Sequence, residues 1–185
     1  MPLDPQLIAQ VLRTPRTQDV TGSPIVRAIV LQDPANAADF VAALETAKTL
    51  EACNARLILC EFGADAVPAL AARLTTAGPN ARREGLDVLW ALLINESPTA
   101  RRDRLKEVKE VLNLLFDDRT PLRVDIPAHI ERDFTGRICD LAYIRIQLLL
   151  SPRFDQSLFR SLDDEGRDRA IDVLKRDDFS AMLRA

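Results

Sequence analysis

The chain of 185 residues contains a single histidine, His129, and only three cysteines. A di-iron centre needs several histidine ligands, so this chemistry is excluded by the number of ligands alone. A zinc site needs cysteines or histidines at close spacing, and the sequence has neither a CxxC nor an HxxxH pair. The sequence therefore predicts no metal ion and no cofactor.

Cys53, Cys60 and Cys139 are an odd number of cysteines, which indicates a reducing compartment rather than a disulfide framework. The first thirty residues have no basic segment followed by an unbroken apolar stretch, so no secretory signal is predicted. The longest apolar runs are far shorter than the roughly 20 residues that cross a bilayer. We therefore expect a soluble, cytoplasmic protein with no membrane partner.

Charge of one sign is also lacking, because 25 basic and 28 acidic side chains are intermixed and give a formal net charge of -3. No uniform field is available to attract nucleic acid. Only four residues are lysine, so arginine supplies most of the positive charge. Arginine is suited to bidentate pairing with carboxylates, either of a partner or of the same chain.

Motifs for nucleotide binding or nucleophilic catalysis are absent. The six glycines are isolated from one another, and neither a GxGxxG nor a Walker pattern occurs. His129 beside carboxylates could act as a general base with Ser151 as nucleophile, but no GxSxG motif supports this reading. A buried structural thiol is also favoured over a reactive one for Cys139. We predict that the chain is not an enzyme.

What the sequence does contain is apolar residues at helical spacing along nearly its whole length, which predicts an all-α fold. Residues 25–31 are expected to form a helix, because Ser23 and Pro24 are typical of a helix start. Their β-branched residues leave a buried strand as the alternative. Asp133 is expected to cap the helix that follows it. The other main helices are predicted at 37–48, 52–62, 65–77, 80–95, 101–116 and 135–150.

The stretch EFGADAVPALAARL, residues 61–74, carries a glycine and a proline within helical spacing. We interpret it as a junction between two antiparallel helices. Gly63 can adopt the left-handed conformation that ends the first helix, and Pro68 then lies in the first turn of a helix that starts at Asp65. The tripeptide NAR opens a helix at 54–56 and again at 80–82, which indicates a repeated unit.

Residues within 62–93 resemble the two-helix unit of bacterial HEAT-like (armadillo-type) repeat proteins. The segment GRICDLAYI at 136–144 is similar to the opening helix of a terminal repeat. The residues that carry the closer match are Phe62, Gly63, Ala66, Val67, Pro68, Ala69, Leu70, Leu74, Asn80, Ala81, Arg82, Arg83, Leu86, Leu89 and Leu93.

This resemblance implies one domain over 1–185, a short α-solenoid of antiparallel helix hairpins stacked around one core. The best repeat match spans 54–94, an irregular insert spans 117–133, and capping helices follow at 151–185. By resemblance, the helices near 37–48, 65–77 and 101–116 line the concave surface.

The resulting functional hypothesis is a non-enzymatic interaction or scaffold module that binds a protein through its concave surface and the 117–133 insert, since long connections in compact domains are often functional. The expected contact residues are Arg73, Arg104, His129, Arg132 and Arg137. A first alternative is a nucleic-acid binder of the DNA-repair glycosylase type, with phosphates held by Arg73, Arg82, Arg83, Arg101, Arg102 and Arg104. A second is a structural subunit or homo-oligomer that covers its exposed terminal repeats by self-association.

Overall fold

The computed structural model describes residues 3–15, 17–46, 49–122, 136–151 and 153–177, and within these ranges the protein is all-α. The described part contains no β-strand, only an isolated bridge between Pro121 and Arg137. None of its helices combines the length and the apolar character that crossing a membrane requires. The predicted all-α class is confirmed.

The chain divides into two compact units, Met1–Leu92 and Leu93–Ala185. The first unit contains α1 (Pro5–Leu12), α2 (Pro24–Gln32), the 3-10 helix η1 (Pro34–Asn36), α3 (Ala37–Thr46), α4 (Thr49–Phe62), η2 (Gly63–Asp65), α5 (Ala66–Leu74) and most of α6 (Pro79–Asn95). The second contains the end of α6, then α7 (Pro98–Glu107), α8 (Lys109–Phe116), α9 (Ile138–Leu150), α10 (Gln156–Arg160) and α11 (Asp164–Arg176). The expectation of a single domain stays a prediction.

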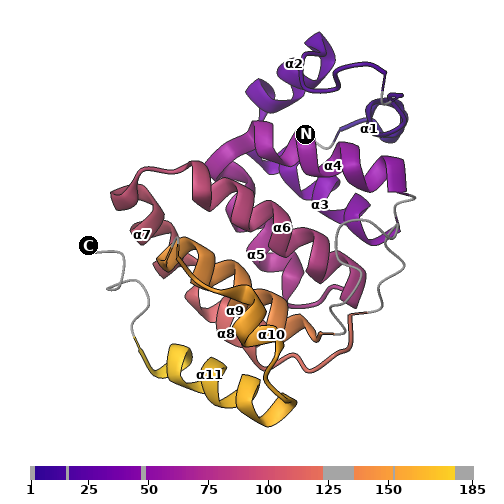
Figure 1. The fold of residues 1–185 in the computed structure, drawn as a ribbon. Helices are drawn as coiled ribbons and strands as arrows, with labels where there is room; N and C mark the ends of the chain where they lie inside the picture. Colours follow the sequence, from indigo (N-terminus) through magenta and orange to yellow (C-terminus); the bar gives the residue numbers. More distant parts are fainter. Residues whose placement is uncertain (1–2, 16, 47–48, 123–135, 152, 178–185) are drawn as a thin grey trace. The chain divides into compact units, whose positions relative to one another are not determined.

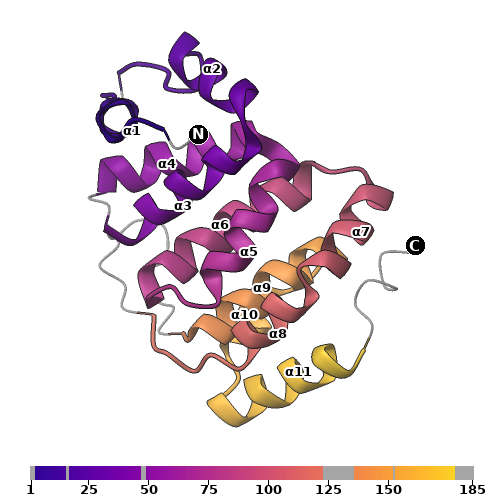
Figure 2. The ribbon, with the colours of Figure 1, turned by 180° about the vertical axis from the view of Figure 1, so that it is seen from behind.

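In the first unit, α3 packs against both α4 and α5 (Figures 1 and 2). Three apolar side chains at helical spacing on α3 face the core, since Phe40 is fully buried and Val41 and Leu44 are nearly so. The Phe40 ring lies 6.0 Å from that of Phe62, centroid to centroid. Helix α3 therefore contacts both the next helix and α5.

Residues 25–31 form helix, as predicted. Pro24 occupies the first helical position, where the missing N–H removes no intrahelical bond. Val26 and Ile29, three positions apart, are buried, whereas Leu31 is 86% exposed. The packing of this one stripe outweighs the slightly lower helix propensity of the β-branched residues.

The junction at residues 61–74 is formed as expected. Gly63 has φ of 57°, and it is the one described glycine in the left-handed region. Gly63 is also the first residue of η2, and α5 begins at Ala66 rather than at the predicted Asp65, so Pro68 is the third residue of α5. Neither residue interrupts a helix.

The two NAR tripeptides are not equivalent, which corrects the expectation that each opens a helix. The second does, because α6 begins at Pro79. Asn54, in contrast, lies in the second turn of α4, which begins at Thr49. Its buried Nδ2 donates to the carbonyl oxygens of Leu12 and Thr14, both at 2.8 Å. The first asparagine therefore ties the C-terminal end of α1 to α4.

In the second unit, the helix expected over 101–116 is interrupted at Val108, where φ is -96° and ψ is 3°. The β-branched residue lowers helix propensity at this point. The chain nevertheless keeps the hydrogen bond from the Leu112 N–H to the Val108 carbonyl, at 2.9 Å. Leu105 before the interruption and Leu112 after it are both fully buried.

Helix α9 is the most buried helix of the second unit. It begins at Ile138 rather than at residue 135, and Asp133, the expected cap, lies outside the described residues. Tyr143 on α9 stacks on Phe159 of α10, with ring centroids 4.4 Å apart and an interplanar angle of 21°. Stacked aromatic pairs of this kind add to the stabilisation from burial.

Candidate functional site

The structure describes three of the five residues that the sequence nominates for partner binding. Arg73 lies near the end of α5 in the first unit, Arg104 lies on α7, and Arg137 directly precedes α9. His129 and Arg132 lie outside the described residues. Arg104 and Arg137 are both in the second unit, but they share no ion-pair partner.

Arg73 and Arg104 are partly exposed and paired with carboxylates. Arg73 pairs with Glu45 of α3, so this ion pair links two helices of the first unit. Arg104 Nη1 lies 2.6 Å from Glu107 Oε2, one turn further along α7. Exposed pairs contribute little to stability, typically below about 1 kcal/mol, so either arginine can exchange its carboxylate for that of a partner at small cost.

Backbone hydrogen bonds join residues 118–122, in the first part of the insert, to residues 136–139, which the sequence did not indicate. The Leu122 N–H donates to the Gly136 carbonyl at 2.8 Å, and the Ile138 N–H donates to the Thr120 carbonyl at 3.0 Å. The Cys139 N–H donates to the Asp118 carbonyl at 2.9 Å. These antiparallel contacts hold the segment that leaves α8 against the segment that enters α9.

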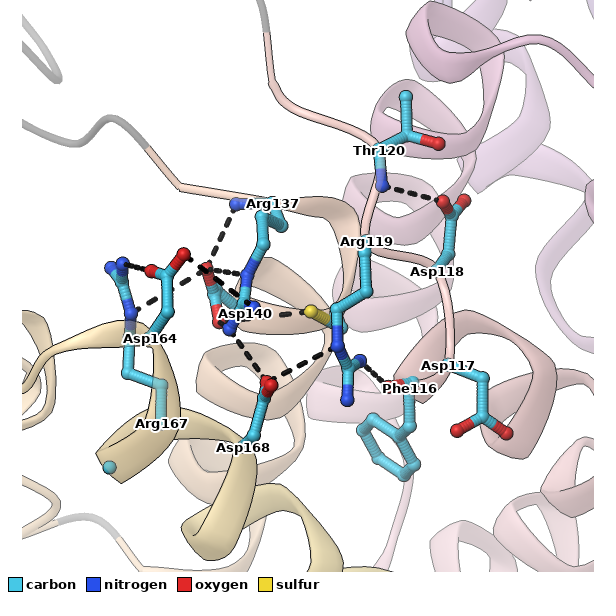
Figure 3. Close-up of polar contacts among 12 residues, drawn as sticks. Phe116, Asp117, Asp118, Arg119, Thr120, Arg137, Asp140, Asp164, Arg167 and Asp168 are labelled. Carbon is cyan, nitrogen blue, oxygen red and sulfur yellow. Dashed lines mark hydrogen bonds and ion pairs between the residues drawn. The ribbon is translucent and has the colours of Figure 1, made fainter.

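At the start of α9, Arg137 and Asp140 form a tight pair (Figure 3). Asp140 Oδ2 accepts from the backbone N–H of Arg137 at 2.9 Å, which caps the first turn of α9. The guanidinium donates through Nε to Oδ2 at 3.1 Å and through Nη2 to Oδ1 at 2.9 Å. Asp140 is fully buried and the Arg137 side chain is 13% exposed, so the bidentate pair is shielded from water.

Helix α11 completes the cluster with side chains from its first two turns. Asp168 Oδ1 accepts from Arg137 Nη2 at 2.8 Å and lies 3.2 Å from Arg119 Nε (Figure 3). Arg167 pairs with Asp164 and lies 3.8 Å from Asp140. We call these six residues the Arg137 cluster: Arg119, Arg137, Asp140, Asp164, Arg167 and Asp168.

The Arg137 cluster is electrically balanced, with three arginines and three aspartates. The hydrogen bonds that Arg137 donates to Asp140 and Asp168 raise its pKa above the usual range, although burial opposes this. The hydrogen bond from Arg167, followed by the charge of Arg137, lowers the pKa of Asp164. Both shifts favour the charged forms of Arg137 and Asp164.

Charge pairs make a large part of the contact between α11 and the rest of the second unit. Eight of its 13 residues are charged, and only Ile171 and Leu174 are buried. Two buried aliphatic side chains supply roughly 1.5–3 kcal/mol each. A fifth inter-element pair among the described residues joins Lys175 Nζ to Asp117 Oδ1 at 2.6 Å, at the other end of the helix. The carboxylates that α11 contributes are partly exposed, Asp168 by 34% and Asp164 by 68%, so each of these pairs contributes less than a buried pair would.

Cys139 lies in this region and is fully buried, as predicted. Burial, followed by the charge of Asp140, raises the pKa of its thiol to about 11. The sulfur is 3.8 Å from Asp140 Oδ1. The thiol is therefore protonated at neutral pH and is a poor nucleophile.

The arginines nominated for phosphate contacts are engaged within the chain. Arg101 donates to the carbonyl oxygens of Leu93, Ile94 and Glu96 at 2.7–3.1 Å and so caps the end of α6. Arg83 pairs with Glu84, which also pairs with Arg56 of α4. Among the described side chains, no group of three or more His, Cys, Asp or Glu is placed to hold a metal ion.

Sequence reasoning identified Arg137 but missed its partners. Asp140 follows it by three positions, a spacing that places an acidic N3 residue opposite the start of a helix and could have been recognised. Asp168 is 31 positions away, and no local pattern connects it to Arg137. No protein-family model matches the chain, and comparison with curated proteins and with solved structures found no match either.

Proposed function

We propose that the chain is a non-enzymatic protein-interaction module, a short HEAT-like α-solenoid that binds a protein partner through its inner helices and the 117–133 insert. The packing of α3 against both α4 and α5 supports stacked hairpins in the first unit. The resemblance implies that α3, α5 and the α7–α8 segment are its inner helices.

The observation that carries this proposal is that Arg73, Arg104 and Arg137 each hold a carboxylate of the chain itself. Arginine paired with a carboxylate is the chemistry by which one protein surface recognises acidic side chains of another. Phosphate recognition, in contrast, needs an excess of cations, and the carboxylate of Glu84, which pairs with Arg83, reduces that excess. A protein partner is therefore favoured over nucleic acid.

The test is affinity capture from a lysate of the native host, comparing the wild type with the double variant Arg73→Glu, Arg104→Glu. A matched control carries the same change of charge at two other exposed arginines, Arg27→Glu and Arg153→Glu. A protein captured by the wild type and the control, but not by the double variant, supports the proposal. Equal capture by all three removes Arg73 and Arg104 from the interface.

The two alternatives have distinct signatures. A nucleic-acid binder would show DNA affinity that falls steeply with salt, because each phosphate contact releases a counterion. A self-associating subunit would show a mass above that of the monomer in light scattering. We expect neither a steep salt dependence nor an assembly at micromolar concentration.

A further inference from the structure

Arg137, nominated from the sequence as a partner-binding residue, is covered in the structure by α11. Asp164 and Asp168 of α11 lie on its guanidinium, at 3.9 Å and 2.8 Å. A carboxylate from a partner would occupy the same positions, so Arg137 can bind a partner carboxylate only in molecules in which α11 is undocked. Helix α11 therefore takes the place that a ligand would take.

The charges and apolar residues of α11 define what this surface recognises. Asp164 and Asp168 are one turn apart and face arginines, whereas Ile171 and Leu174 continue the same side of the helix and are buried. Lys175 follows and meets Asp117. The opposite side carries Glu165, Arg169, Asp172 and Arg176, which are exposed.

We propose that the surface formed by α8, α9 and the 117–122 segment is a docking site for an amphipathic helix of a partner protein, which displaces α11. The partner helix carries two acidic residues one turn apart, followed by aliphatic residues three and six positions after the second. This inference rests on the proposed function and specifies the partner's recognition element. Helix α11 acts as an intramolecular competitor that keeps the site closed.

The competition has a quantitative consequence. The apparent affinity for an added helix is the intrinsic affinity multiplied by the fraction of molecules in which α11 is undocked. Because α11 is held by charge pairs as well as by two aliphatic side chains, removing its two aspartates raises that fraction. Binding of an added helix with the original sequence then becomes tighter, although nothing in the docking surface itself has changed.

The experiment uses the full chain and a fluorescent synthetic peptide with the sequence of residues 162–177. We expect the Asp164→Ala, Asp168→Ala chain to bind this peptide at least tenfold more tightly than the wild type in fluorescence anisotropy. The matched control, Glu165→Ala, Asp172→Ala, removes two negative charges from the exposed side of α11 and is expected to behave like the wild type. A peptide with Asp164→Lys and Asp168→Lys is expected not to bind.

Thiol labelling provides a second measure of whether α11 is undocked from α8 and α9. Cys139 is buried beside Asp140, whereas Cys60 is exposed and labels in every variant. We expect Cys139 to be labelled faster in the Asp164→Ala, Asp168→Ala chain than in the control. If this variant loses its helical circular dichroism signal, Lys175→Glu, which faces Asp117, loosens α11 from its other end and leaves the Arg137 cluster intact.

Equal peptide affinity for the loosened chain, the control and the wild type overturns the proposal, as does equal binding of the charge-reversed peptide. If the loosened chain instead forms dimers that the peptide cannot compete away, the occupant is α11 of a second copy and the proposal of a different partner is wrong. Failure here is distinguishable from failure of the proposed function, because the capture experiment changes Arg73 and Arg104, neither of which belongs to this surface.

Discussion

One positive φ angle allows α4 to pass into α5 at Gly63. A Cβ atom at this position would meet nothing within 4 Å, so replacing the glycine introduces backbone strain without a steric clash. We expect Gly63→Ala to lower the free energy of unfolding by about 1–2 kcal/mol, the usual penalty of the left-handed region for an L-residue. Urea denaturation measures the change. Gly78→Ala, where the added methyl group also meets open space and φ is not positive, is expected to have little effect or to stabilise.

The buried side chain of Asn54 joins α1 to α4 with two hydrogen bonds to backbone carbonyls. In Asn54→Ala both carbonyls lose their side-chain donor, and an unsatisfied buried polar group costs roughly 1–3 kcal/mol. We expect a loss of this size in thermal or urea unfolding. Gln10→Ala, at an exposed position of α1, should change stability by less than about 0.5 kcal/mol. An equal effect of both substitutions would show that the Asn54 bonds contribute nothing.

At the scale of elements, the start of α9 depends on one buried carboxylate. Asp140→Ala removes the cap on the Arg137 N–H and leaves two largely buried guanidinium groups without their shared anion. We expect a loss of about 3–5 kcal/mol, as for other broken buried pairs. Asp103→Ala, which breaks an exposed pair with Lys106 on α7, should cost less than about 1 kcal/mol. Comparable losses would mean that burial of the Arg137 cluster has no energetic role.

The helices also show which features of the fold could be predicted from the sequence. The apolar residues of α3, α5 and α9 recur within one or two turns, so their helices and buried stripes followed from local spacing. Gly63 and Pro68 were recognisable for the same reason. The interruption at Val108 could not be predicted, because no glycine or proline lies near it. The pairing of Arg119 and Arg137 with Asp168 depends on how α11 packs against α8 and α9, and sequence spacing carries no information about that.

At the scale of the whole molecule, the resemblance predicts one domain, whereas the packing forms two compact units. Helix α6 continues across their boundary, with buried Leu86 and Leu89 before it and buried Leu93 directly after it. Because a helix unwinds cooperatively, loss of the packing around its first turns also weakens its end. This continuity favours a single unfolding transition.

Hydrogen exchange of two core variants distinguishes one domain from two. Phe40→Ala in α3 and Phe116→Ala in α8 each truncate a fully buried ring, which typically costs 3–5 kcal/mol. If the chain is one domain, either variant lowers the protection of amides in both α4 and α9, because opening of one unit opens the other. Loss confined to the unit that carries the substitution would show two domains joined by a shared helix. We expect the first result, because α6 cannot keep its end folded when the packing of Leu86 and Leu89 is lost.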